Sequence, residues 1–314
     1  MQFTKCPGCL KPGKGGYCRI CLGTLFDGKR VSPILGFSRP DFNRVKNSRT
    51  SRISISGVQA KHSLKLSGRS LELTDTGGEY ILKPVPNDTF EAVSEMPANA
   101  MVFFSDGEPA YLTRRFDRKK DGTKTLQEDF AQLTERTEES HGGAYKYDGS
   151  YEEIADLMRK HIGPYAIEVE RLFDQVVFNY LILNGDAHLK NFSLFHDPVP
   201  ALYRMTPAYD LVNSRLHIPD EVGDMALEMF KDDFKTASFA ANDFYAKNDF
   251  VAFGGKIGMM PKRVAGSLEK FTTGLGGMKS LIENSFLRED SKRTNLGLVE
   301  SRIGRLSYSY SGTR

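Results

Sequence analysis

The spacing of apolar residues predicts strands first and helices later along the chain. In SISGVQAKHSLKL (residues 54–66), a Ser- and Gly-containing turn is followed by residues 62–66, which alternate with the two-residue period of a strand. LELTD and EYILKP predict two further strands, joined by a turn at Gly77-Gly78. The segment AYLTRRFDR predicts a further strand, whereas FEAVSEMPANAMVFF (residues 90–104) has helical spacing that Pro97 interrupts. We therefore expect the first third of the chain to be rich in β-structure.

Beyond this β-rich part the apolar spacing becomes helical. Ser150 and Glu153 form a capping box in front of YEEIADLMRKH, and an apolar-rich helix is expected over residues 169–183. The segment LFHDPVPALYRM has the pattern of a hairpin, and Gly-rich turns at residues 254–255 and 274–277 are expected between the later helices. A small β-rich lobe followed by a larger helical lobe is the layout of a protein kinase, so we predict a two-lobed α+β fold.

The composition is that of a folded, water-soluble protein. Hydrophobic residues make up 39% and charged residues 26%, which excludes a largely disordered, collagen-like or membrane-embedded chain. The longest apolar run, residues 176–183, is much shorter than the ~20 residues of a membrane helix, and the N-terminus lacks the pattern of a secretory signal. The net charge of +3 is too small for a typical nucleic-acid binder. We expect a cytoplasmic protein.

All four cysteines lie near the N-terminus and suggest a metal site. They form CPGC, an eight-residue spacer and CRIC, a pattern that can bring four thiolates into the tetrahedral arrangement of Zn²⁺. The residues concerned are Cys6, Cys9, Cys18 and Cys21. The short spacer favours a compact, structural zinc knuckle; two disulfides or a redox pair are the alternatives. The basic, polar residues 38–52 that follow are expected to form an exposed connection.

The strongest chemical signal is the run NGDAHLKN after the apolar-rich helix. In phosphoryl transfer, an aspartate such as Asp186 can orient and deprotonate the attacking hydroxyl, while Asn191 can reach a metal ion on the phosphates. Asp210, in the segment TPAYDL, can supply the second carboxylate that Mg²⁺ requires. A lone D-x-x-x-x-N often forms an ordinary turn or helix cap, so the three residues together carry the prediction.

Lys83 is the candidate for a phosphate-binding lysine. The segment YILKP places it on a strand, on the same face as Ile81, from which it could reach the phosphates of ATP. Glu95, or Glu91, on the following segment could pair with Lys83 and fix its direction. The alternative is an exposed lysine at the end of a strand.

Together these segments resemble a known family. SISGVQAKHSLKL, YILKP, TRRFDR, NGDAHLKNFSLF and TPAYDL occur in the order seen in the HipA-type serine/threonine kinases, toxins of bacterial toxin–antitoxin systems. The resemblance covers residues 54–218 and implies ATP and Mg²⁺ as cofactors. The roles that it implies are a catalytic Asp186, magnesium ligands Asn191 and Asp210, an ATP lysine Lys83, an adenine hinge at Arg114 and Phe116, and nucleotide-facing His188 and Lys190. Arg114 is a departure, because HipA has glutamate there.

The segment SISGVQAK must cover the phosphates, because the chain contains no G-x-G-x-x-G or Walker motif. Gly57 permits unusual backbone angles, neighbouring N–H groups can point at phosphate oxygens, and Lys61 adds a positive charge. The residues expected at the nucleotide here are Ser56, Gly57, Val58, Gln59 and Lys61. The resemblance implies that a serine of this loop is autophosphorylated, which makes Ser54 and Ser56 candidates; an ordinary Ser-rich surface turn is the alternative.

The chain resembles most the short HipT kinases of three-component systems. It has only about fifty residues before the serine loop, and its loop carries two serines. We expect a cysteine module over residues 1–34, an N-lobe over 35–117 and a helical C-lobe over 118–314. The resemblance implies an aminoacyl-tRNA synthetase as the protein substrate, and as antitoxins a small HipS-like protein or a helix-turn-helix HipB-like protein. Direct DNA binding is not expected of this chain.

Two other functions are compatible with parts of the sequence. Small-molecule kinases of the aminoglycoside or choline type use a similar G-D-x-x-x-x-N loop. A catalytically inert binding module would use the zinc unit and the lobes to bind a partner, but it would not need Asp186, Asn191, Asp210 and Lys83 together.

Overall fold

The structure is a computed structural model that describes residues 3–13, 15–49, 61–84, 101–119, 121–198, 201–217 and 223–311. It divides into two compact units: unit 1, Met1–Thr123 with Leu281–Lys292, and unit 2, Lys124–Ser280 with Arg293–Arg314. Both contain strands and helices, which confirms the predicted α+β class. Within the described ranges, no helix combines the length and the apolar character needed to cross a membrane.

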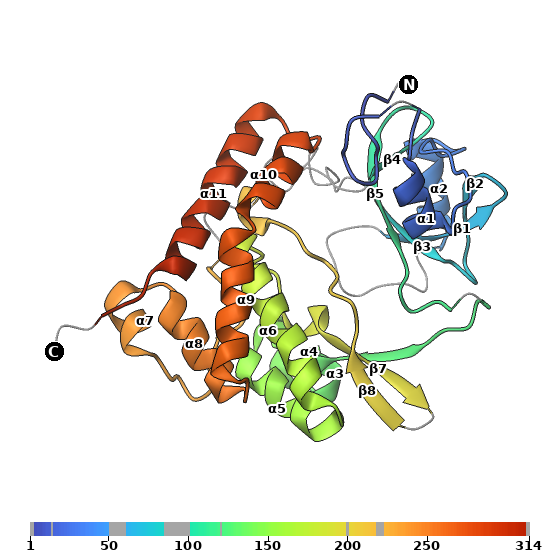
Figure 1. Cartoon of the computed structure of the whole chain (residues 1–314). Helices are drawn as coiled ribbons and strands as arrows, with labels where there is room; N and C mark the ends of the chain where they lie inside the picture. The colour runs from blue at the N-terminus through green and yellow to red at the C-terminus, as the bar shows by residue number, and fades with distance from the viewer. Residues whose placement is uncertain are drawn as a thin grey trace. The chain divides into compact units, whose positions relative to one another are not determined.

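Unit 1 is built on a five-stranded antiparallel sheet with the order β2-β1-β3-β5-β4. Its helices α1 and α2 are drawn over this sheet in Figure 1. The elements of unit 1 are α1 (Arg19–Phe26), α2 (Arg39–Arg49), β1 (His62–Ser67), β2 (Ser70–Leu73), β3 (Tyr80–Pro84), β4 (Met101–Phe103) and β5 (Pro109–Arg114). The predicted strands around Gly77-Gly78 and over AYLTRRFDR are therefore confirmed.

The core of unit 1 joins the cysteine-bearing segment to the sheet. Phe26 of α1 is 1% exposed, and its ring lies 5.5 Å from that of Tyr80 on β3. The Tyr80 hydroxyl donates to the Leu25 carbonyl at 3.0 Å, and the Tyr17 hydroxyl donates to the Met101 carbonyl, also at 3.0 Å. The cysteine segment is consequently packed into the same core as the strands.

Two expectations for unit 1 were wrong. The basic stretch does not form an exposed connection, because it forms helix α2, in which Phe42 is fully buried and Asp41 accepts a hydrogen bond from the Ser38 backbone N–H at 3.1 Å. The end of the expected helix over residues 90–104 is instead strand β4, which pairs with β5 and has three buried side chains. Residues 85–100, including Pro97, lie outside the described residues.

Unit 2 combines a small antiparallel sheet, of order β6-β7-β8, with a set of helices. Its strands are β6 (Leu126–Asp129), β7 (Ser193–Pro198) and β8 (Ala201–Met205). Its short helices are α3 (Phe130–Leu133), α4 (Glu138–His141), η2 (Tyr145–Tyr147), η3 (Leu189–Asn191), η4 (Ser214–Leu216) and α7 (Ala237–Asn242). Its longer helices are α5 (Tyr151–His161), α6 (Tyr165–Leu181), α8 (Lys247–Lys256), α9 (Pro261–Thr273), α10 (Leu275–Asn284) and α11 (Glu289–Ser307), the last two of which contribute residues 281–292 to unit 1.

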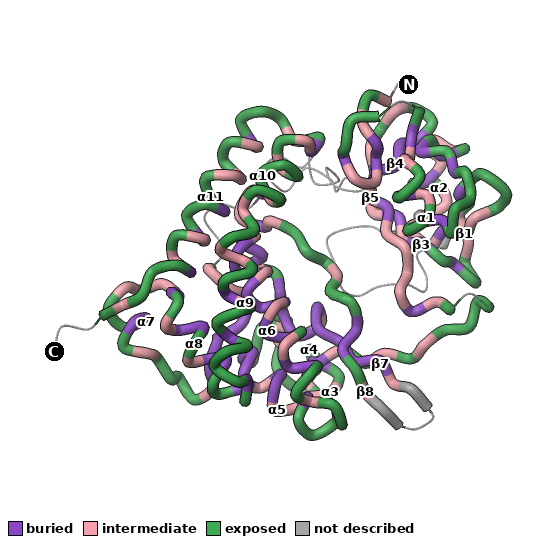
Figure 2. Tube along the Cα trace, in the orientation of Figure 1, coloured by how far each residue is buried: buried purple, intermediate pink, exposed green. Residues whose placement is uncertain are grey.

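Helix α6 forms the centre of unit 2, and Figure 2 shows long stretches of it as buried. It matches the predicted apolar-rich helix, shifted by a few residues toward the N-terminus. The Ser150 side chain accepts a hydrogen bond from the Glu153 backbone N–H at 3.1 Å, so the N-cap of α5 is confirmed. The reciprocal half of the predicted capping box is not formed, because the Glu153 carboxylate pairs with Arg136 instead. The predicted hairpin is β7–β8.

The expected Gly-rich turns at residues 254–255 and 274–277 were wrong in part. Gly254 and Gly255 lie inside α8, and a Cβ at Gly254 would clash with Val264 on α9. The glycine therefore serves close packing between two helices. Gly274 ends α9, but the two glycines at residues 276–277 lie within α10.

Candidate active site

The candidate catalytic loop follows α6 and is shaped by hydrogen bonds within unit 2. Leu183 has a left-handed backbone with φ of 55°, which turns the chain sharply at the end of the helix. The Asn184 amide donates to the Asn179 side chain at 2.9 Å, and the Ser214 hydroxyl accepts from the Gly185 N–H at 2.8 Å and donates to the Leu183 carbonyl at 3.0 Å. The loop is thus held on both sides by partners far apart in sequence.

Asp186 stands exposed at the tip of this loop, with 53% of its side chain accessible. Its Oδ1 accepts a hydrogen bond of 2.5 Å from the Tyr147 hydroxyl. The Lys146 ammonium lies 4.0 Å and the His188 Nε2 lies 3.7 Å from the same oxygen. An exposed carboxylate held from one side has the placement that a general base needs.

His188 and Asn191 are buried on the inner side of the loop, each 6% exposed. The His188 backbone N–H donates to Asn191 Oδ1 at 3.1 Å, and the Asn191 N–H donates to the His188 carbonyl at 2.9 Å. An amide oxygen has two lone pairs, so one remains for a metal ion. Burial lowers the pKa of His188 to about 4, so the ring is neutral, and its buried Nδ1 has no hydrogen-bond partner among the described residues.

Asp210 follows β8 and also has a left-handed backbone, with φ of 53°. Its carbonyl accepts a hydrogen bond from the Asn184 amide at 3.1 Å, which ties it directly to the catalytic loop. Upstream, the Arg171 guanidinium of α6 donates to the carbonyls of Met205 at 3.1 Å and Thr206 at 3.3 Å, so the approach to Asp210 is also fixed. A carboxylate, Asp210, and an amide, Asn191, are oxygen donors of the kind that Mg²⁺ prefers, and this donor set fits the predicted ion.

Lys190 is held at the rim of the loop. Its ammonium lies 3.4 Å from the Tyr145 hydroxyl and 3.7 Å from the Asp129 carboxylate, and its carbonyl accepts from the Tyr209 hydroxyl at 2.7 Å. Ser193 also hydrogen-bonds the Tyr209 hydroxyl. The backbone of Lys190 is therefore anchored, and the positive charge of its side chain is balanced by the Asp129 carboxylate.

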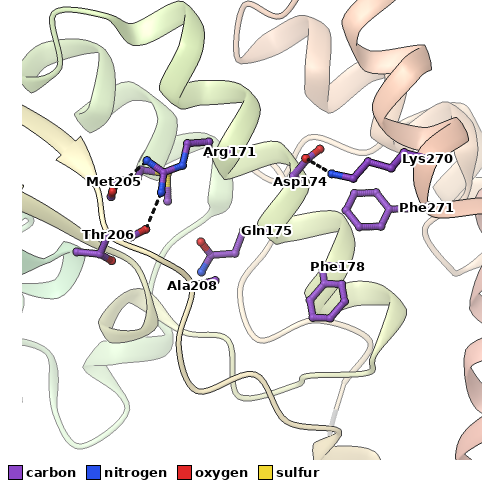
Figure 3. Close-up of a pocket in the computed structure, with 9 residues that line it drawn as sticks. All are labelled: Arg171, Asp174, Gln175, Phe178, Met205, Thr206, Ala208, Lys270 and Phe271. Atoms are coloured by element: carbon purple, nitrogen blue, oxygen red, sulfur yellow. Dashed lines mark hydrogen bonds and ion pairs between the residues drawn. The ribbon is translucent and has the colours of Figure 1, made fainter. Parts of the chain in front are cut away.

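A concavity of about 290 Å³ lies behind this loop, between α6, α9 and the segment that leads to Asp210. Figure 3 shows its lining residues, with Arg171 bonded to the backbone of residues 205–206 and Lys270 paired with Asp174. Gln175, on the same wall, donates to the Asn191 carbonyl at 3.4 Å. The charged groups that line the concavity are therefore paired within the protein.

The remaining predicted nucleotide residues are in unit 1 or outside the described residues. Lys83 and Ile81 are half-buried on one face of β3, as predicted, and the Lys83 ammonium lies 6.0 Å from the centre of the Tyr111 ring. Lys61 is exposed just before β1. The predicted site residues that lie outside the described residues are Ser54, Ser56, Gly57, Val58, Gln59 and Glu95.

The predicted hinge lies at the end of β5. The Arg114 guanidinium pairs with the Asp27 carboxylate at 2.6 and 3.1 Å and donates to the Thr24 carbonyl at 3.2 Å. These contacts direct the side chain toward the C-terminal end of α1. Any adenine contact at Arg114 would therefore use its backbone, while Phe116 is half-buried.

The four cysteines converge, as the spacing predicted. Their sulfur atoms all lie within 4.8 Å of one another, and none is in a disulfide. The Cys9 and Cys18 sulfurs are 3.7 Å apart, close to the ~3.8 Å that follows from four Zn–S bonds of about 2.3 Å in a tetrahedron. A Cβ at Gly8 would lie 2.8 Å from Cys21 Sγ, so only glycine leaves room for this sulfur. An all-thiolate set fits Zn²⁺.

Comparisons with known proteins identify the family of this chain. The profile of the HipA-like C-terminal domain matches residues 53–275. The chain belongs to this family. A Haemophilus influenzae protein named "Putative kinase" is 28% identical over 299 residues, covering 82% of this chain and 84% of that relative. The predicted membership of the HipA group is therefore confirmed.

Solved structures support the fold of this HipA-like chain. HipA of Shewanella oneidensis, in a complex with HipB and operator DNA, matches with a TM-score of 0.61 and 20% identity, over 85% of this chain and 71% of that chain. The Helicobacter pylori kinase CtkA matches with a TM-score of 0.52 and 15% identity, over 82% of this chain and 92% of that chain. The predicted kinase-like fold is confirmed.

The sequence pattern missed several residues that shape the site. The triplet Tyr145–Tyr147 lies about forty residues before Asp186, and yet all three of its side chains contact the catalytic loop. Asn184, which lies within the run NGDAHLKN, and Ser214 were given no role in the sequence analysis. A polar residue next to a motif and a tyrosine-rich turn are weak signals without the fold.

Proposed function

We propose that this HipA-like chain is an ATP-dependent serine/threonine protein kinase and the toxin of a bacterial toxin–antitoxin system. The observation that carries the proposal is the assembled loop. Asp186 is exposed and held, Asn191 is fixed behind it, and Asn184 joins the loop to Asp210. A catalytically inert binding module would need none of these hydrogen bonds.

In this proposal each residue has a defined task. Bound Mg²⁺–ATP supplies the phosphoryl group and neutralises its charge, with Asn191 and Asp210 as metal ligands and Lys83 at the phosphates. Asp186 orients a serine hydroxyl and accepts its proton. His188 and Lys190 border the nucleotide. His188 is neutral there because burial lowers its pKa. Most of the rate enhancement then comes from positioning and from charge stabilisation.

The kinase proposal includes autophosphorylation of the chain at Ser54 or Ser56. A phosphate of about −2 charge in this loop would compete with the phosphates of ATP for the same donors, among them Gly57 and Lys61. The phosphorylated protein would then be inactive. The proposal rests on the sequence of the loop and on the family to which the chain belongs.

The test is intact-mass spectrometry after incubation with Mg²⁺ and ATP. The wild type should gain phosphate on Ser54 or Ser56, whereas Asp186→Asn should gain none and still bind ATP, a rate loss of at least about 10³-fold. Ser54→Ala combined with Ser56→Ala should prevent the modification without unfolding the protein. Full phosphorylation of Asp186→Asn would refute the assignment of the base. ATP binding without any phosphate on the wild type would favour a small-molecule kinase.

The proposed substrates and partners follow the family. Glutamyl- and tryptophanyl-tRNA synthetases are the first protein substrates to test, with the Asp186→Asn variant as the control. A HipB-like or a small HipS-like antitoxin is the expected partner, acting in the cytoplasm. Zn²⁺ in the cysteine cluster would be structural, because four thiolates leave no open position for a substrate.

A further inference from the structure

Tyr147 is placed to hold the catalytic carboxylate in one orientation. Every described hydrogen bond or ion pair of the Asp186 side chain ends on Oδ1: the Tyr147 hydroxyl at 2.5 Å, His188 Nε2 at 3.7 Å and the Lys146 ammonium at 4.0 Å. Within the described ranges, no hydrogen bond or ion pair reaches Oδ2. One carboxylate oxygen is therefore anchored and the other is left accessible, on a side chain that is 53% exposed.

The tyrosine itself is fixed from several directions. Its ring packs edge-on against the buried His188 ring, with centroids 5.1 Å apart, and the Lys146 ammonium lies 4.9 Å from the Tyr147 ring centre. Its backbone N–H donates to the Ala144 carbonyl at 2.8 Å. A side chain held by packing on its ring and by its backbone loses little entropy when its hydroxyl makes a hydrogen bond.

The turn that carries Tyr147 is also anchored. The next residue, Asp148, lies 3.7 Å from the Arg136 guanidinium, which forms two hydrogen bonds of 3.0 Å with Glu153 on α5. Gly149 has φ of 153°, and a Cβ there would lie 2.8 Å from the Glu153 carboxylate. The chain therefore passes close to this ion pair, which fixes η2 against the start of α5.

We infer that Tyr147 is a positioning residue for phosphoryl transfer, which anchors Asp186 Oδ1 so that Oδ2 receives the proton of the acceptor hydroxyl. In this step the acceptor oxygen forms a bond to the γ-phosphorus, the bond between that phosphorus and ADP breaks, and the proton moves to Oδ2. The inference rests on the proposed kinase activity. A carboxylate with one fixed oxygen needs less reorganisation when the hydroxyl arrives, so the benefit appears in kcat.

The experiment follows autophosphorylation of the protein by intact mass at a series of Mg²⁺–ATP concentrations. The rate constant at saturating ATP serves as kcat, and the ATP concentration at half of that rate serves as the KM for ATP. Tyr147→Phe keeps the ring on His188 and removes the hydroxyl, so we expect kcat to fall about tenfold while the KM for ATP changes less than about twofold. Tyr147→Leu removes both contacts and should lower kcat further. Tyr203→Phe is the control, because the Tyr203 hydroxyl has no hydrogen bond among the described residues and its ring stacks on His196.

The outcomes separate the inference from the kinase proposal. If Asp186→Asn is inactive but Tyr147→Phe has the wild-type kcat, the kinase stands and the inference is wrong. A higher kcat for Tyr147→Phe would mean that the hydroxyl blocks the acceptor, and this result would also overturn the inference. A raised KM at constant kcat would make Tyr147 a nucleotide contact instead. If Asp186→Asn keeps full activity, both ideas fail. Thermal unfolding of Tyr147→Phe should match the wild type, which excludes a folding defect.

Discussion

The cysteine cluster and the catalytic loop are both short, polar and rich in turns, but they are completed in different ways. In the catalytic loop, the protein itself supplies the partners: Asn184 and Ser214 bind the backbone, and Tyr147 binds Asp186. In the cysteine cluster, four sulfurs meet within 4.8 Å of one another, and the Cys18 backbone N–H donates to the Cys6 sulfur at 3.2 Å. One site is organised by hydrogen bonds before any ligand arrives, whereas the other is the proposed zinc site, in which a cation would hold the four sulfurs.

The protonation of the two sites shows the same contrast. Burial raises the pKa of the Cys9 and Cys21 thiols, whereas a hydrogen bond from the Cys21 backbone N–H lowers the pKa of Cys18 to about 7. Thiols that resist ionisation in the free protein become thiolates only when a cation binds. In the catalytic loop, burial favours the neutral form of His188, and a neutral ring needs no cation to compensate it.

The largest effect that we expect comes from removing the metal. A strong zinc chelator should release one Zn²⁺ per chain and remove protection against hydrogen exchange from α1, because a structural zinc ion contributes about 10 kcal/mol in small domains. Amide exchange in the catalytic loop should stay slow, since its hydrogen bonds lie within unit 2. Cys21→Ser should reproduce the loss.

Two results would contradict this metal prediction. Unchanged protection of α1 after chelation would mean that Phe26 and Tyr80 hold the segment by packing alone. A mass lower by four protons, with no metal, would identify two disulfides. The chain contains no other cysteine, so a thiol titration reports on this cluster alone.

A smaller effect should appear with acid. The folded pKa of His188 is about 4, below the ordinary value of 6.5, so the folded state binds fewer protons than the unfolded state between these values. Stability from this group is complete above pH 6.5 and is lost as the pH falls toward 4, by up to about 3 kcal/mol. Urea unfolding followed by circular dichroism, at about pH 7 and about pH 4.5, should show this loss in the wild type but not in His188→Gln. A difference between the two proteins that is independent of pH would refute it.

The smallest expected effect concerns the contact between α1 and β5. Arg114 and Asp27 are half-exposed, so solvent screens their ion pair, and their coupling in a double-mutant cycle should stay below about 1 kcal/mol. Asp27→Asn keeps a residue that tolerates the left-handed backbone, with φ of 51°, and Arg114→Gln removes the other charge. Thermal unfolding of the two single variants and the double variant measures the coupling. A value of several kcal/mol would show that this pair, rather than the metal, holds the cysteine segment.

The sequence predicted the elements whose signal is local. The cap at Ser150, the strand that carries Lys83 and the apolar-rich helix before Asp186 all follow from spacing and from the residues at their ends. Helix α2 was missed because its only strong apolar anchor is Phe42, inside a run of charged and polar residues. Its stability comes from packing against the sheet, which the pattern does not reveal.

In the candidate site, as in the fold, the sequence predicted the residues whose signal is local. Asp186, Asn191 and Asp210 stand in recognisable segments, and the cysteines stand in pairs. The residues that hold the catalytic loop in place were not predictable. Tyr147 and Ser214 contact the loop through the tertiary fold, from 39 residues before Asp186 and 29 residues after Gly185. A hydrogen bond between distant segments leaves no periodicity in the sequence. The anchoring of a catalytic residue is therefore the part that requires a structure.

Unit 1 is not continuous along the chain, and this has a consequence for how it folds during synthesis. Residues 281–292 belong to it, and the Lys5 ammonium donates to the Asn284 carbonyl at 3.0 Å across 279 positions of sequence. The Phe103 ring meets Phe286 at 6.4 Å in the same region. The ribosome makes the cysteine segment before unit 2, yet it makes the partners of Lys5 and Phe103 only after most of unit 2. Unit 1 should therefore acquire its final contacts last, after most of unit 2 has already emerged.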